Sequence, residues 1–159
     1  MAFNFNADDI FEIAEKIEEN GATFYNQASE KISNEHFKKL LSGLSFMEDE
    51  HRKTFSAMRA SLSDKEKEPT VFDPMDESAV YLKALADLRV FHQLQIDMTS
   101  IESTLFYAIN AEKDSIVFYD AMKGFVPDRL GKEKIDKIIN EEKKHLQVLG
   151  NELIALKKQ

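Results

Sequence analysis

The sequence predicts an all-α protein: a four-helix bundle with a crossover connection between the second and third helices. Two observations indicate this class. Apolar residues recur every three or four positions along four long stretches, and the clearest interruption, rich in charge and proline, falls in the middle of the chain. No stretch keeps the alternation that is typical of a strand. Because 159 residues are enough for one core and few for two, we expect a single domain over residues 1–159.

The first two helices are predicted before the interruption. The first covers about residues 7–32, where apolar residues from Ile10 to Ala28 share one face. Ser33 is a residue type that caps helix N-termini, and we expect a second helix of about 28 residues to follow it. One side of this helix is predicted to carry Phe37, Leu40, Leu41, Leu44, Met47, His51, Phe55 and Met58.

The helical pattern returns after the interruption "SDKEKEPTVFDPMD". Each proline in this stretch disfavours helical geometry at the residue before it. We predict a crossover helix at about 77–95 and a third main helix at about 100–123, with Thr99 and Glu102 forming a capping box. The turn "GFVPDRLG" then precedes the fourth main helix, at about 131–157.

The composition excludes several kinds of protein. The chain has no cysteine, so disulfides, iron–sulfur clusters and cysteine-bound metals are excluded within it, and a metal would need Asp, Glu or His ligands. A net charge of −8 argues against nucleic acid as a partner. No basic start precedes an apolar run, and no window approaches the roughly 18 apolar residues of a membrane span. We therefore expect a cytoplasmic protein without nucleic-acid or membrane partners.

A spacing motif occurs in both halves of the chain. Glu48-x-x-His51 lies in the second predicted helix, and Glu142-x-x-His145 lies in the fourth. Residues three apart on a helix lie on the same face, so both side chains of a pair could reach one ion. One such pair is a weak signal, because glutamate is common in this sequence.

The surrounding residues repeat with the same separation. Four pairs of identical residues stand 94 positions apart: Glu18 and Glu112, Tyr25 and Tyr119, Glu48 and Glu142, and His51 and His145. A single Glu from each of two helices and a Glu-x-x-His from each of two others is the ligand set of a dimetal centre in a bundle core. Four carboxylates cancel the charge of two divalent ions, and carboxylate with imidazole suits iron or manganese.

The paired E…ExxH pattern, with "EENGATFY" and "EKDSIVFY", resembles the ferritin-like superfamily and, within it, the rubrerythrin-type diiron proteins, over about residues 7–157. The resemblance implies a ferritin-like bundle with a two-iron cofactor, in which manganese or zinc could replace iron. It implies no catalytic group beyond the six metal ligands Glu18, Glu48, His51, Glu112, Glu142 and His145. Glu48 and Glu142 would bridge the metals, and Tyr25 and Tyr119 would lie next to the ligands.

The chain also departs from that family. Rubrerythrins usually carry a rubredoxin domain with cysteine-bound iron, and this chain has neither the length nor the cysteines, so electrons would come from a separate donor such as a rubredoxin. Rubrerythrins tend to have an extra Glu one turn after the ligand of the third helix, and the corresponding residue here is Ser115. The redox-linked ligand exchange attributed to that extra Glu is therefore in doubt. Gly21 corresponds to Ser115, and two small residues predict a cavity for peroxide, dioxygen or water. Close helix packing is the alternative reason for their size.

The resemblance implies a nonhaem diiron oxidoreductase of oxidative-stress defence, reducing hydrogen peroxide or dioxygen and forming a homodimer. A ferroxidase or iron-storage protein, which needs a hollow oligomer, and a non-enzymatic metal-binding bundle are the alternatives. Core packing alone could also explain the two tyrosines. Four acidic neighbours of the ligands are expected in solvent: Glu15, Glu19, Glu50 and Glu141. The last three are rotated by about 100° around their helices from the adjacent ligand. His36 and His92 are expected to be ordinary polar residues.

Overall fold

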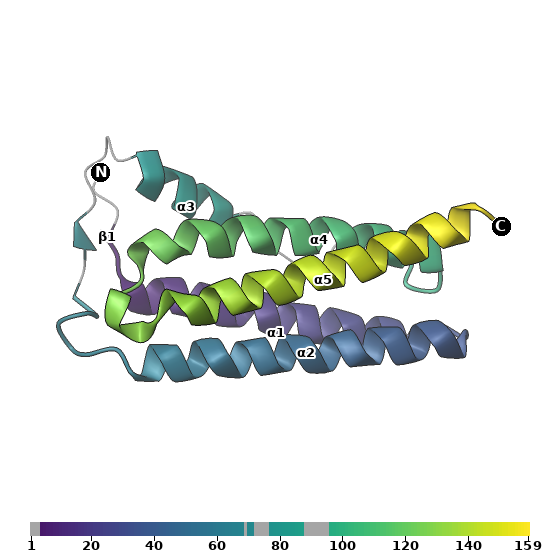
Figure 1. Ribbon diagram of the computed structural model, residues 1–159, viewed down its shortest axis with the longest axis horizontal. Helices are drawn as coiled ribbons and strands as arrows, with labels where there is room; N and C mark the ends of the chain where they lie inside the picture. The colour runs from purple at the N-terminus through teal and green to yellow at the C-terminus, as the bar shows by residue number, and fades with distance from the viewer. Residues whose placement is uncertain (1–3, 69, 72–76, 88–95) are drawn as a thin grey trace.

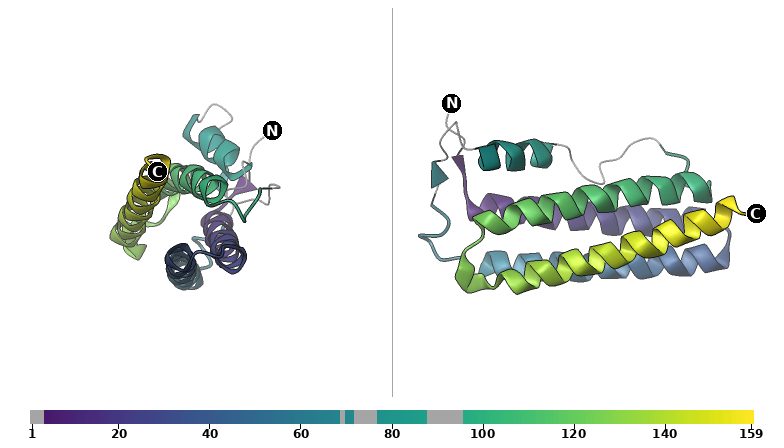
Figure 2. Two further views of the ribbon diagram at one scale, coloured as in Figure 1. Left: turned by 90° about the vertical axis from the view of Figure 1, so that its right-hand side faces the viewer. Right: turned by 45° about the horizontal axis from the view of Figure 1, so that its top comes forward.

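The computed structural model describes residues 4–68, 70–71, 77–87 and 96–159. Its four long helices run alongside one another (Figure 1), as the views in Figure 2 also show. These helices are α1 (Ala7–Lys31), α2 (Glu35–Ala60), α4 (Ile101–Met122) and α5 (Lys132–Lys157). The all-α bundle predicted from the sequence is therefore confirmed, and the ends of its main helices lie within one or two residues of the predicted ones.

The helices pack mainly as two pairs. Helix α1 lies along α2, and α4 lies along α5. The shorter helix α3 (Glu77–Asp87) packs on the outside of α4 (Figure 2) and belongs to the crossover connection. It covers the first part of the predicted 77–95 helix, and residues 88–95, with His92, lie outside the described residues.

Short elements complete the described chain. Strand β1 (Asn4–Phe5) pairs antiparallel with β2 (Thr70–Val71), with Asn4 opposite Val71 and Phe5 opposite Thr70. The sequence did not predict these strands, because two residues are too few to show an alternation. Two 3₁₀ turns, η1 (Lys123–Phe125) and η2 (Asp128–Leu130), join α4 to α5. Gly131, the residue before α5, has a φ of 81°, a conformation that favours glycine.

Two of the predicted N-terminal helix caps are wrong by one residue. Helix α2 is capped by Asn34 rather than Ser33, because the Asn34 side chain accepts the backbone N–H of Phe37. Helix α4 is capped by Ser100 rather than Thr99, whose hydroxyl instead donates to Asp97. Several residues of capping type stand in a row at both places, so the sequence located the helix start but not the cap itself.

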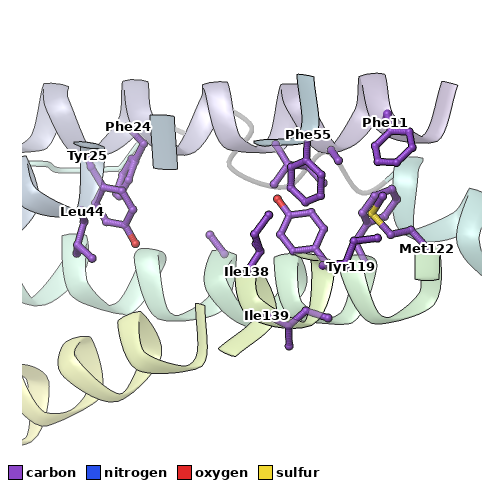
Figure 3. Packing of buried hydrophobic residues seen from close by; sticks show 14 of the residues in the cluster. Phe11, Phe24, Tyr25, Leu44, Phe55, Tyr119, Met122, Ile138 and Ile139 are labelled. Carbon is purple, nitrogen blue, oxygen red and sulfur yellow. The ribbon is translucent and has the colours of Figure 1, made fainter. Parts of the chain in front are cut away.

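The core is a continuous apolar cluster between the helices, and Figure 3 shows part of it. The cluster is rich in phenylalanine, and Phe11, Phe55 and Phe118 have no exposed surface. Tyr25 and Tyr119 are also fully buried, and in Figure 3 their hydroxyl groups point toward the stretch of the bundle between them. None of the described helices has the length and apolar character needed to cross a membrane.

Candidate metal centre

The structure brings the six predicted ligand residues together in the middle of the bundle. Glu18 comes from α1 and Glu112 from α4, while α2 supplies Glu48 with His51 and α5 supplies Glu142 with His145. All six are buried, with at most 6% of their surface exposed. Burying four carboxylates and two imidazoles in an apolar bundle is costly unless each is compensated. The arrangement therefore needs an explanation beyond packing.

The six residues form two overlapping groups. Glu18, Glu48, His51 and Glu142 offer one ligand atom each, all within 4.8 Å of one another, and Glu48, Glu112, Glu142 and His145 do the same. Glu48 and Glu142 belong to both groups. Two ions placed in these groups would share the two carboxylates, which is the position of bridging ligands.

The histidines direct the same ring nitrogen into the cluster. His51 Nδ1 lies 2.9 Å from Glu142 Oε1 and 3.7 Å from Glu18 Oε2. His145 Nδ1 lies 3.0 Å from Glu142 Oε2 and 3.2 Å from Glu48 Oε1. The two rings stack with their centroids 5.7 Å apart. Glu142 thus contacts both rings, one with each oxygen.

The tyrosines hold the single glutamates from the opposite helix. Tyr25 on α1 donates to Glu112 Oε1 at 2.5 Å, and Tyr119 on α4 donates to Glu18 Oε1 at 2.6 Å. Each tyrosine is both a core residue and a hydrogen-bond donor to a candidate ligand. The two interpretations left open by the sequence therefore apply together.

The prediction for Glu141 is wrong. Its side chain is 25% exposed, and Glu141 Oε2 lies 2.7 Å from His51 Nε2. The angular argument considered α5 alone, whereas a side chain rotated away from the ligands on α5 reaches a ring on α2. The sequence carries no signal for this contact, because it depends on which side of α5 the neighbouring helix occupies.

The other acidic neighbours and His36 lie in the described part of the chain and form no hydrogen bond or ion pair with the candidate ligands. Glu19 and Glu50 are exposed as predicted. The prediction for Glu15 is wrong: its side chain is 20% exposed and accepts a hydrogen bond from Arg59. Glu15 lies three residues before Glu18 and therefore close to the same side of α1. His36 is exposed and lies 2.8 Å from Glu152 across the α2–α5 interface.

The electrostatics of the cluster reflect crowded carboxylates around two imidazoles. Burial, together with the neighbouring carboxylates, raises the pKa of Glu18 and Glu48 well above the usual range and that of Glu112 to about 8. Burial also disfavours charge on Glu142, but its hydrogen bonds with His145 and His51 outweigh this, and its pKa is lowered.

The pKa values of both histidine rings are also raised, which for an imidazole favours the charged form. Burial lowers the pKa of His51, but Glu142 outweighs this effect and raises the value to about 9. The pKa of His145 rises against burial to about 12, through Glu112, Glu142 and Glu48. The carboxylates as a group therefore favour positive charge at the centre of the bundle.

The donor set fits a pair of metal ions. Three carboxylate oxygens, Glu18 Oε2, Glu48 Oε1 and Glu112 Oε2, are fully buried and have no hydrogen-bond partner in the described part of the chain. An unsatisfied buried acceptor costs about 1–3 kcal/mol and usually has a specific reason. Metal coordination would satisfy all three, and the cluster combines them with two inward-facing imidazole nitrogens.

The two small residues of the predicted cavity are buried one turn beyond the single glutamates. Gly21 lies in α1 after Glu18, and Ser115 lies in α4 after Glu112. The Ser115 hydroxyl donates to the carbonyl of Ala111 at 2.9 Å. The cavity itself stays a prediction.

Fold and site together define a ferritin-like bundle with the residues of a dimetal-carboxylate centre. A family model described as Rubrerythrin matches residues 9–153, and the chain therefore belongs to the rubrerythrin family. The structure is similar to the crystal structure of a protein from Thermotoga maritima that is described as a candidate ferritin-like diiron-carboxylate protein. That likeness has a TM-score of 0.69 and 25% sequence identity, and it covers 94% of this chain and 95% of the other. A comparison with curated proteins gave no match.

Proposed function

We propose that the six clustered residues hold two iron ions and that the protein is a nonhaem diiron oxidoreductase that reduces hydrogen peroxide. The observation that carries the proposal is the sharing of Glu48 and Glu142 by two ligand groups, each completed by one further Glu and one His. Membership of the rubrerythrin family supports a diiron cofactor. Four carboxylates would neutralise two divalent ions in the core.

The ligand groups assign the residues to two metal positions. The first position would take Glu18 and His51, the second would take Glu112 and His145, and Glu48 and Glu142 would serve both. Iron, manganese and zinc all accept such oxygen and nitrogen ligands, and iron suits redox chemistry. When bound, the metal pair would polarise peroxide and supply electrons to it.

The protein residues would prepare this reaction rather than carry it out. Tyr119 and Tyr25 hold Glu18 and Glu112 by short hydrogen bonds, so that the remaining oxygen of each carboxylate is free for a metal. The buried cluster excludes bulk water, which strengthens electrostatic interactions within it. Reduction of one peroxide to two water molecules consumes two electrons and two protons, and a separate donor such as a rubredoxin would return the electrons.

The reaction is tested by loading the protein with Fe²⁺ without oxygen and mixing it with peroxide and with dioxygen in separate stopped-flow experiments. The proposal expects oxidation by peroxide to be the faster reaction and to be repeated when a reductant is present. Faster oxidation by dioxygen with retention of ferric iron would favour iron oxidation and storage. Binding of iron without either reaction would favour a non-enzymatic bundle.

The number of subunits in the assembly independently distinguishes peroxide reduction from iron storage. We propose a homodimer, whereas storage of iron needs a hollow shell of many subunits. Light scattering coupled to gel filtration, performed on the metal-loaded protein, distinguishes the two. A dimer that turns over peroxide agrees with the proposal, and a large shell contradicts it.

A further inference from the structure

The two halves of the metal centre differ at the position that precedes the bridging glutamate. The residue before the bridging glutamate is Glu141 on α5, and the residue 94 positions earlier is Met47 on α2. All six candidate ligands and both tyrosines are identical between the halves. This pair therefore breaks the symmetry that the six ligands and the two tyrosines keep.

Glu141 holds the outer side of the His51 ring. Its Oε2 lies 2.7 Å from His51 Nε2, while His51 Nδ1 faces Glu142 and Glu18 inside the cluster. The two nitrogens lie on opposite sides of the imidazole, so holding one fixes the direction of the other. A carboxylate that accepts from the outer N–H also increases the electron density of a ligand ring.

His145 lacks an equivalent partner. Its Nδ1 faces Glu142 and Glu48, and among the described residues Nε2 has no hydrogen-bond partner. Met47, which occupies the position that corresponds to Glu141, has only a thioether, a weak acceptor. The His145 ring is therefore held from the inner side alone.

We propose that Glu141 is a positioning residue that orients His51 for metal binding, so that the position formed by Glu18, Glu48, His51 and Glu142 is the tighter of the two. The two ions are then bound in sequence, this position first. The inference rests on the proposed metal centre. Loss of a carboxylate behind a metal-binding histidine typically weakens metal affinity about 10- to 100-fold, which gives the expected size of the effect.

The inference is tested by calorimetric titration of the metal-free protein with Zn²⁺, which has the charge of Fe²⁺ and does not change oxidation state. The wild-type protein should show two separate binding steps. In Glu141→Ala the first step should weaken about 10- to 100-fold and merge with the second. Glu141→Gln retains an acceptor oxygen for His51 and should restore part of the difference between the steps.

Glu133→Ala is the matched control. Glu133 is an exposed carboxylate on α5, two turns before Glu141, and lines the same surface hollow. Its removal changes the charge of the protein equally but should leave both Zn²⁺ steps unchanged. Since the Glu141 side chain is 25% exposed, its truncation should leave the thermal unfolding of the metal-free protein within a few degrees of the wild type.

Histidine side-chain NMR of the zinc-loaded protein gives a second readout, which a general loosening of the bundle would not mimic. The His51 Nε2–H signal should be protected from exchange in the wild type and lost in Glu141→Ala, while His145 should be unaffected. Two unchanged Zn²⁺ steps in Glu141→Ala would overturn the inference and leave the metal centre intact. A wild-type protein that binds no Zn²⁺ pair would instead overturn the metal centre.

Discussion

Tyr119 on α4 donates a 2.6 Å hydrogen bond to Glu18 on α1, and both residues are completely buried. Tyr25 on α1 makes the reciprocal hydrogen bond with Glu112 on α4. Few contacts join α1 to α4 directly, since α1 packs mainly on α2 and α4 on α5. The tyrosines therefore link the two helix pairs through the candidate metal ligands.

Removing one of these hydroxyl groups should destabilise the protein. Tyr119→Phe keeps the ring in the core but leaves Glu18 Oε1 without a donor, which should cost about 1–3 kcal/mol of unfolding free energy. Tyr25→Phe should cost a similar amount. Urea denaturation of the metal-loaded protein measures both. The control is Tyr81→Phe at a side chain that is 52% exposed, which should change stability by less than about 0.5 kcal/mol. Equal stability of Tyr119→Phe and the control would contradict this role.

Substitutions of the glutamates should affect the metals unequally. Glu48→Gln removes a carboxylate shared by both ligand groups, so neither ion should be retained after dialysis. Glu18→Gln touches one group only and should leave about one ion per chain, because the second group keeps all its members. Elemental analysis measures the ratio, and Glu19→Gln, at an exposed neighbour, is the control. Full retention of both ions by Glu48→Gln would refute the bridging role.

Glu48→Gln should make the metal-free protein more stable, although it should prevent the protein from retaining metal. Glu48 is buried among other carboxylates, and burial raises its pKa well above the usual range, so that folding must either bury a charge or take up a proton. Glu48→Gln removes that cost and should stabilise the chelator-treated protein by about 1–3 kcal/mol at pH 8. Denaturant unfolding with and without chelator measures the effect. Destabilisation of the metal-free form would indicate that Glu48 serves packing rather than metal binding.

Arg59 should make the stability of the bundle sensitive to acid. Arg59 at the end of α2 pairs with Asp8 at the start of α1, and this hydrogen bond lowers the pKa of Asp8 below its usual value. A lowered carboxyl pKa gives stability that is present above the ordinary aspartate range and is lost as pH falls through the lowered pKa. Arg59→Gln should therefore cost about 0.5–1 kcal/mol at pH 7 and progressively less below pH 4.

Denaturation of wild type and Arg59→Gln at a series of pH values measures this effect. Arg52→Gln is the control, because Arg52 pairs with Asp49 inside the same helix and joins no two helices. Its effect should be close to zero at pH 7. A constant difference between Arg59→Gln and wild type down to pH 2 would show that the Asp8 carboxylate is not the partner that matters.

Periodicity and spacing were sufficient to predict the bundle and the six clustered residues. Residues such as Glu48 and His51 lie on one face of one helix, and helix geometry alone fixes that relation. The contact of Glu141 with His51 could not be predicted, because it depends on how α5 is rotated against α2. The caps Asn34 and Ser100 were missed for a different reason: adjacent residues of the same type can cap equally well.

The central claim is that Glu48 and Glu142 bridge two metal ions in the bundle core. Anomalous diffraction at the iron absorption edge, from crystals of the iron-loaded protein grown without oxygen, tests it most directly. We expect two iron peaks per chain, one beside Glu18 and His51 and one beside Glu112 and His145, with both bridging glutamates between them. An absence of iron among these residues, or a single ion bound by only one of the two groups at saturating iron, would contradict it.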